Sequence, residues 1–415
     1  MLFRLQFRFN RHDIVRILAI IWLIGVVVFF SIFYLNDLNS NRLERRDYYC
    51  FYYAGLLYRQ GQSGYEHPER LFANPPFVLP LLALISNAGP TRSYLIFFAL
   101  GVLCVIASIR VATRIQGVPK SFFLTWLLLA FSTPSLFFAL HLGQLTPAYL
   151  LLWSLTLWGW CTGSDRIAGI ASACLSAKPP LALFAWIFGF LIRPWRFRIS
   201  AIIGLFALVL IGKPWQIENW EAFFKALEKI ANKHEHKIES WRKQHTLYAI
   251  LRTLLWKAHG SPIQEPEQGL FEARVLALAI ILALSIVGGF FFFRHRKIFL
   301  EWRHRPERMA RLCSLAMLAT VSLNFYLFYY DSAILILSAM ILFAFRSDWI
   351  SLGRWWGALL CAIGIALSQP WVVIFLNFPS PVGALALTWL VLEAQDLAAL
   401  LHKEALMATS QKLGP

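Results

Sequence analysis

Asp47 is the ionisable residue whose position most strongly suggests chemistry. It follows the first apolar run of the chain, in a polar loop where Arg45 and Arg46 precede it. A carboxylate in such a place can act as a general base, taking a proton from a hydroxyl as the oxygen of that hydroxyl attacks. The same carboxylate could instead pair with a neighbouring arginine at the surface. Asp37 and Glu44 lie nearby and are alternative acids.

Lys178 and Asp331 are two further charged residues at the ends of apolar segments. Lys178 lies in AKPP, where the prolines break an apolar run, and Asp331 lies in NFYLFYYDSAIL. Ionisable groups at membrane depth are costly unless they are paired or hydrated, which favours a functional role for Asp331. The alternatives are a lysine that snorkels to the membrane interface and an aspartate that caps a helix N-terminus.

The composition requires a membrane to surround these residues. Of the 415 residues, 58% are hydrophobic and only 15% are charged, which is too apolar for a soluble domain. Several apolar runs reach the roughly 17–25 residues that a transmembrane helix needs. The net charge of +17 is explained more economically as a topology signal than as a nucleic-acid surface. The sequence therefore predicts an all-α polytopic membrane protein that has the bilayer, and no nucleic acid, as a partner.

Placing the short basic loops on the cytoplasmic side gives a consistent path of about twelve transmembrane helices, with both termini inside. The first run lacks a cleavage site and is expected to be retained. The stretch from 166 to 192 is basic at both ends, so we expect a hairpin broken at AKPP. The chain is treated as one membrane domain, 1–415, with outer loops at 36–92 and 213–268. The spans are expected near 14–35, 93–110, 121–139, 146–161, 166–192 (two helices), 199–212, 270–293, 309–328, 332–346, 353–368 and 381–401.

The two outer loops carry their own helical patterns. YYCFYYAGLLYRQG in the first loop has the aromatic content of a helix that lies in the membrane interface. The second loop has amphipathic helical spacing, and its lysines fit a solvated face. The apolar residues expected near one face are Trp220, Phe223, Phe224, Leu227 and Ile230.

A set of short motifs, in order along the chain, resembles glycosyltransferase family 87. The first outer loop resembles the family pattern through Asp47, Tyr52, Ala54, Gly61, Tyr65 and the segment FANPPF, 72–77. HLGQLTP, AKPP, the hairpin that ends in RPWRFR, and Arg252 in QHTLYAILR follow in the family's order. Asn74 stands where the family often has tyrosine. The resemblance covers about residues 14–350.

This resemblance implies a GT-C fold and a polyprenyl-phosphate sugar, mannose by first preference, as donor at the outer membrane surface. It implies inversion at the anomeric carbon, with Asp47 as the base. The acceptor would be a hydroxyl of a glycolipid or of a cell-envelope glycan. The family and the retained first helix point to a bacterial cytoplasmic membrane.

The resemblance also suggests roles for other residues predicted on the outer side. A phosphate leaving group needs positive charge or hydrogen-bond donors, and Lys178, Arg252 and His245 could supply them. Asp331 would position the sugar or support the site electrostatically. His141 and Gln144 could bind sugar or phosphate, or simply satisfy a helix end. Four tyrosines of the first loop would anchor it at the interface and could line an acceptor groove by stacking on sugar faces, namely Tyr48, Tyr49, Tyr52 and Tyr53.

No cofactor is predicted. The sequence has no Walker loop and no Rossmann glycine fingerprint, which favours a lipid-linked over a nucleotide-linked donor. The first outer loop has no DxD pair and the six cysteines lack metal-ligand spacing, so no metal ligand is assigned, although a divalent ion held by residues from distant segments stays open. Two other functions remain: a transporter or flippase for a lipid-linked sugar, and a non-catalytic subunit of an envelope-glycan complex.

Overall fold

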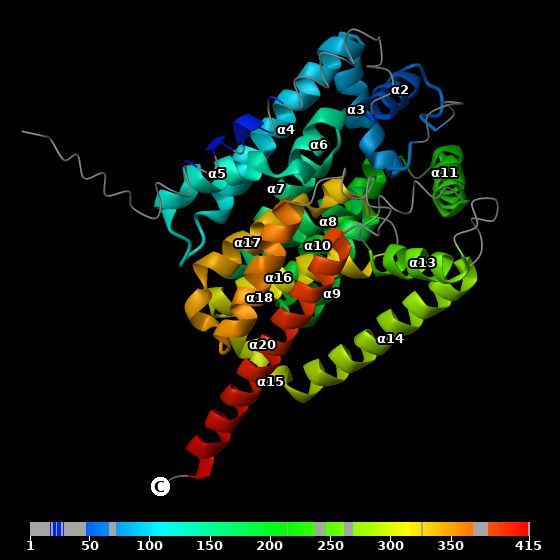
Figure 1. Cartoon of the computed structure of the whole chain (residues 1–415). Coiled ribbons are helices and arrows are strands. Elements are labelled where there is room, and N and C mark those ends of the chain that lie inside the picture. The colour runs from blue at the N-terminus through cyan, green and yellow to red at the C-terminus, as the bar shows by residue number, and fades with distance from the viewer. Residues whose placement is uncertain are drawn as a thin grey trace, which may run out of the picture.

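The computed structural model describes residues 17, 20–21, 23–25, 28, 47–65, 72–213, 215–236, 244, 246–260, 269–324, 327–367 and 381–413. Every named element in these ranges is helical, and the one β-pairing they contain is an antiparallel bridge between Gln244 and Phe328 (Figure 1). The predicted all-helical architecture is therefore confirmed.

The α-helices, in chain order, are α2 (Tyr48–Arg59), α3 (Leu79–Ile85), α4 (Pro90–Ala112), α5 (Phe123–Ser132), α6 (Pro134–Leu142), α7 (Thr146–Thr162), α8 (Asp165–Cys174), α9 (Pro179–Ile192), α10 (Trp195–Ile211), α11 (Ile217–His236), α13 (Leu247–Ala258), α14 (Leu270–Arg294), α15 (Arg296–Trp302), α16 (Pro306–Leu323), α17 (Leu335–Ala344), α18 (Leu352–Leu367) and α20 (Pro381–Leu413). Short 3₁₀ turns join them: η2 (Pro76–Val78), η3 (Ser86–Ala88), η4 (Lys120–Phe122), η5 (Leu175–Ala177), η6 (Tyr329–Ile334) and η7 (Arg346–Asp348).

The lengths of these helices support a membrane protein but do not confirm about twelve crossings. Within the described ranges, α4, α14 and residues 382–407 of α20 are long and apolar enough to span a bilayer. The pair α5 and α6 would make a fourth span, bent by 65° where Pro134 starts a new helix. Other apolar helices, such as α9, are shorter than the roughly 20 residues of a complete span. The first predicted span, 14–35, lies mostly outside the described residues.

The hairpin predicted for 166–192 is confirmed. α8 and η5 lead to Lys178, and α9 begins at Pro179, because a proline at the first helical position needs no N–H partner. Arg193 and Asp165 then meet in a buried ion pair of 2.5 Å at the other end of the hairpin. We call this the Arg193 end of the helix bundle, and the opposite one the Asp331 end.

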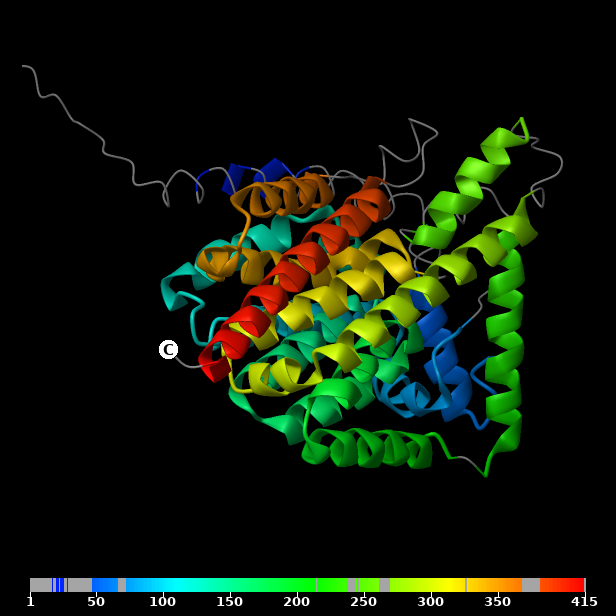
Figure 2. The same ribbon diagram turned by 90° about the horizontal axis from the view of Figure 1, so that it is seen from below.

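The core of the bundle is built around α7, α16 and α20. Three tryptophans, Trp153 and Trp160 from α7 and Trp389 from α20, are almost fully buried, and nearly all of α16 is enclosed. α20 crosses the bundle beside α16 (Figure 2). By contrast, α14 lies along the outside, where Ala273, Ala277 and Phe292 are its buried residues (Figure 1). Its remaining apolar surface is suited to lipid.

The two predicted outer loops pack on each other. The buried cluster that contains α2 and α3 also includes Phe223 and Ala226 of α11, and the rings of Tyr65 and Phe223 are 6.0 Å apart. The predicted helices in both loops are confirmed. The predicted apolar face of α11 is partly wrong, because Phe224 is 61% exposed. Consecutive helical residues point about 100° apart, and here Phe223 faces the cluster while Phe224 points away from it.

Candidate active site

Lys178 and Asp331 form the central ion pair of the Asp331 end. The Nζ of Lys178 donates to both carboxylate oxygens of Asp331, at 2.7 Å to Oδ1 and 2.6 Å to Oδ2. Lys178 is the residue between η5 and α9, and Asp331 lies in η6. The helix break at AKPP and the turn before α17 are therefore what bring the two charges together.

Two other groups hold the Asp331 carboxylate. The hydroxyl of Thr146 donates to Oδ1 at 3.3 Å, and the backbone N–H of Phe328 donates to Oδ2 at 3.1 Å. Asp331 is fully buried, whereas the side chain of Lys178 is 21% exposed. The carboxylate is thus fixed from inside the protein, whereas part of the Lys178 side chain stays exposed.

The ring of Tyr330 gives Lys178 a second contact. The Nζ of Lys178 lies 5.3 Å from the centroid of this ring, within the range of a cation–π interaction. An ammonium group has three N–H donors, and the two carboxylate oxygens occupy two of them. Lys178 can therefore keep its bond to Asp331 and still donate to an anionic ligand.

Asp47 lies at the start of α2 and is held by Gln144. The Nε2 of Gln144 donates to Oδ2 of Asp47 at 2.6 Å. A carboxylate has about four lone-pair sites, so this bond orients the group without exhausting its ability to accept a proton. The structure therefore brings together Asp47 and Gln144, two of the residues that sequence reasoning selected.

The turn at residues 143–145 makes this contact possible. Gly143 adopts φ +68°, a left-handed conformation that closes the C-terminus of α6. A Cβ at this position would lie 2.6 Å from the Cβ of Tyr48. A glycine is needed here both for the backbone angle and for the close approach of α2.

The same segment contacts both carboxylates of the site. Gln144 binds Asp47 and Thr146 binds Asp331. Residues two apart in sequence have Cα atoms separated by at most about 7 Å. The segment HLGQLT thus couples the start of the first outer loop to the Lys178–Asp331 pair.

Asn74 attaches the rest of the first loop to the same place. Its Nδ2 donates to the carbonyl of Ala177 at 2.9 Å and to the hydroxyl of Tyr149 at 3.1 Å. The hydroxyl of Tyr65 donates to the backbone carbonyl of Asn74 at 2.6 Å. Asn74 therefore fixes NPPF against the residue that precedes Lys178.

The tyrosines of the first loop form a packed aromatic cluster. Tyr48 is almost fully buried and Tyr52 is half-buried, with 6.3 Å between the two ring centroids. Burial raises the pKa of Tyr48 and of Tyr65 above the ordinary value for a phenol, so both hydroxyls stay neutral. These two phenols are consequently poor candidates for a base.

The remaining predicted site residues are Arg252, His141 and His245. Arg252 is fully buried on α13, whose N-terminus follows the bridge between Gln244 and Phe328, and its phosphate-binding role stays a prediction. The backbone carbonyl of His141 accepts a hydrogen bond of 3.0 Å from the hydroxyl of Tyr94. His245, Asp37 and Glu44 lie outside the described residues.

Sequence reasoning missed Thr146, Tyr149 and Tyr330. Thr146 lies in the HLGQLTP motif, two residues after Gln144, so its position in the sequence could have indicated that it belongs to the site. Asn74 departs from the family pattern. Its role in fixing the loop depends on a contact with residue 177, which no local sequence pattern shows.

Across the described ranges, no three His, Cys, Asp or Glu side chains gather in a way that could hold a metal ion. The groups that the site offers to a ligand are therefore an ammonium, carboxylates, amides and hydroxyls.

Comparison with known proteins identifies one family. The family model for glycosyltransferase family 87 matches residues 72–323, which is more than half of the chain. The matched range includes HLGQLTP, Lys178 and Arg252, and it ends eight residues before Asp331. No match to the chain is found among the curated proteins.

Proposed function

This chain belongs to glycosyltransferase family 87, and from this membership we propose that it transfers mannose from a polyprenyl-phosphate donor to a hydroxyl of a membrane glycolipid or of an envelope glycan. Its family membership establishes the chain as a membrane glycosyltransferase. The donor lipid, the sugar, the inversion and the residues that act are the proposal.

One observation carries the proposal: a single segment of the chain holds both charged groups of the site. Gln144 binds Asp47, and Thr146 binds Asp331, which is paired with Lys178. A glycosyl transfer with inversion needs a base on one side of the anomeric carbon and stabilisation of the leaving group on the other. Asp47 supplies the base, and Lys178 supplies positive charge for the leaving phosphate.

In the proposed reaction, the acceptor hydroxyl oxygen attacks the anomeric carbon while Asp47 takes its proton. The bond between the anomeric carbon and the phosphate oxygen breaks, and its electron pair leaves with the polyprenyl phosphate. Lys178 donates a hydrogen bond to that phosphate. Asp331 acts as a positioning residue, because its buried carboxylate holds the ammonium of Lys178 in place.

The proposed topology follows from the same reasoning. A lipid-linked donor reaches the site from the bilayer, so the Asp331 end would lie at the outer membrane surface. We place the protein in a bacterial cytoplasmic membrane with a GT-C fold, about twelve crossings and both termini inside. The amphipathic helix α11 and the aromatic helix α2 would then lie at the outer interface.

The test is sugar transfer by the purified protein in liposomes. Polyprenyl-phosphate-mannose and GDP-mannose, each labelled in the sugar, are supplied separately with a glycolipid extract from bacterial membranes. We expect label in glycolipid from the lipid-linked donor alone, and NMR of the product should show the inverted anomer. Transfer from GDP-mannose alone would contradict the proposed donor class, and a retained anomer would contradict the single displacement.

A further inference from the structure

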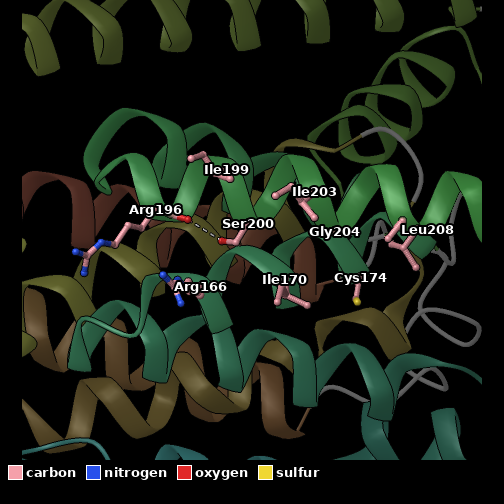
Figure 3. A pocket seen from close by; sticks show the side chains of 10 residues that line it. Arg166, Ile170, Cys174, Arg196, Ile199, Ser200, Ile203, Gly204 and Leu208 are labelled. Carbon is pink, nitrogen blue, oxygen red and sulfur yellow. Dashed lines mark hydrogen bonds between the residues drawn. The ribbon is translucent and has the colours of Figure 1, made fainter.

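A groove of about 630 Å³ runs between α8 and α10 (Figure 3). Its α8 side is a single helical stripe, namely Arg166, Ile170 and Cys174. Its α10 side follows the same spacing, and the lining residues there are Arg196, Ile199, Ser200, Ile203, Gly204, Ala207 and Leu208. The volume falls within the range of small-molecule binding sites, roughly 300–1,000 Å³.

Small residues at the crossing of the two helices form the floor of this groove. A Cβ on Gly169 would lie 2.1 Å from the Oγ of Ser200, and a Cβ on Gly204 would lie 2.9 Å from the Cβ of Ala173. Small residues let helices in a membrane approach closely. The larger side chains on either side, Ile170 and Ile203, then stand above the floor as walls.

The surroundings of the groove are suited to lipid. α10 exposes Ile202, Ile203, Phe206, Leu210 and Ile211, which are all apolar. The only hydroxyl in the lining, that of Ser200, already donates within the helix, to the carbonyl of Arg196 at 2.9 Å. The middle of the groove is therefore suited to a hydrocarbon chain.

One end of the groove is strongly positive. Arg166 and Arg196 are both exposed and lie in the first turns of α8 and α10, so both helix N-termini point to the same place. Within the described part of the chain, neither arginine has an ion pair, whereas the nearby Arg193 is paired with Asp165. Arginine side chains and helix N-termini both favour a phosphate group.

We propose that this groove binds an anionic phospholipid, with one acyl chain between α8 and α10 and the phosphate on Arg166 and Arg196. The arginines lie at the Arg193 end, away from Lys178 and Asp331, so this lipid belongs to the leaflet opposite to the donor. Basic sites between transmembrane helices on the cytoplasmic side bind anionic head groups in this manner. The lipid would stabilise the packing of α8, the helix that leads to Lys178, against α10.

The proposal is tested by native mass spectrometry of the protein released from nanodiscs that contain equal amounts of phosphatidylglycerol and phosphatidylcholine with the same acyl chains. We expect wild type to retain phosphatidylglycerol in preference, by on the order of tenfold. Each of the two basic residues near the surface favours an anionic lipid by about fivefold. The variant R166Q/R196Q should lose the preference. A control variant, R296Q, removes an exposed arginine of α15 outside the groove and should keep it.

A second variant separates the groove from its charges. Ala207→Trp places a large side chain at an exposed lining position while both arginines remain, and it should also reduce retention of phosphatidylglycerol. Unchanged thermal unfolding midpoints in phosphatidylcholine alone would show that the variants fold. Equal retention of phosphatidylglycerol by wild type and R166Q/R196Q would overturn the proposal. Undiminished retention by Ala207→Trp would overturn it too, because the arginines would then act as a surface patch without the groove.

Discussion

Lys178 and Asp331 form an ion pair that joins positions 153 residues apart in the sequence, with Nζ 2.6 Å from Oδ2. The lysine reaches this position because α9 starts at Pro179, and the aspartate because η6 folds back before α17. The pair fixes the place at which a phosphate can bind. It also makes the site sensitive to the loss of either partner.

Lys178→Gln should lower both stability and donor binding. Removing one member of a buried pair typically costs about 3–5 kcal/mol, because the other charge stays buried without compensation. The double variant K178Q/D331N removes both charges and should recover much of the unfolding midpoint without recovering the affinity for the donor. Thermal unfolding and KM for the polyprenyl-phosphate sugar measure the two effects. A double variant with wild-type KM would show that Lys178 does not bind the donor.

Gln144→Glu should move the acidic limb of the pH–activity profile to higher pH. The new carboxylate would lie where an amide now donates to Asp47, and a neighbouring like charge disfavours ionisation. The base would then be protonated over a wider range of pH. Gln144→Ala, which adds no charge, serves as the control. It only removes one hydrogen bond from the carboxylate, so it should lower the rate with a smaller shift in the same direction. Identical profiles for the two variants would mean that Asp47 does not limit the rate.

Gly143→Ala should reduce activity more than Gly61→Ala. Both glycines have positive φ, +68° and +77°, so both alanines carry a backbone strain of about 1 kcal/mol or more. Only the Cβ at position 143 meets another residue, at 2.6 Å from Tyr48, whereas nothing lies within 4 Å at position 61. The first variant should displace Gln144 from Asp47. Equal transfer rates at equal stability would argue against a role for this turn in catalysis.

Arg311→Met should destabilise the protein without changing KM. Arg311 is buried at the Arg193 end, where it pairs with Glu393 at 2.8 Å and with Asp396 at 3.1 Å. Its removal leaves two buried carboxylates and should cost about 3–5 kcal/mol. Arg354→Met is the matched control, because Arg354 is 33% exposed and its contact with Asp396 is 3.5 Å, so a loss below about 1 kcal/mol is expected. Thermal unfolding in nanodiscs compares the two variants.

The sequence predicted those features that depend on local pattern. Hydropathy and the prolines of AKPP were sufficient to predict the hairpin that presents Lys178, and amphipathic spacing predicted α11. Charge sidedness selected Lys178 and Asp331 separately, and the order of motifs supported Asp47 and Gln144. The family match over 72–323 agrees with that resemblance.

Contacts between distant segments could not be predicted in the same way. Nothing in NFYLFYYDSAIL shows that Asp331 faces Lys178, because the pairing depends on how α9, α16 and η6 pack. The contact of Asn74 with Ala177 has the same origin. The predicted number of crossings, about twelve, is not confirmed. Hydropathy identifies apolar segments, but it does not show where a helix breaks within such a segment, as at Pro134.

The most direct test of the central claim compares Asp47→Asn with wild type in sugar transfer from polyprenyl-phosphate-mannose, while donor binding is measured in parallel. Asp348→Asn, at the Arg193 end, is the matched control for loss of one carboxylate. Loss of a general base predicts a rate on the order of 10²–10⁴-fold lower for Asp47→Asn, with donor binding retained and the control unaffected. Equal rates for Asp47→Asn and wild type would contradict the assignment of Asp47 as the base.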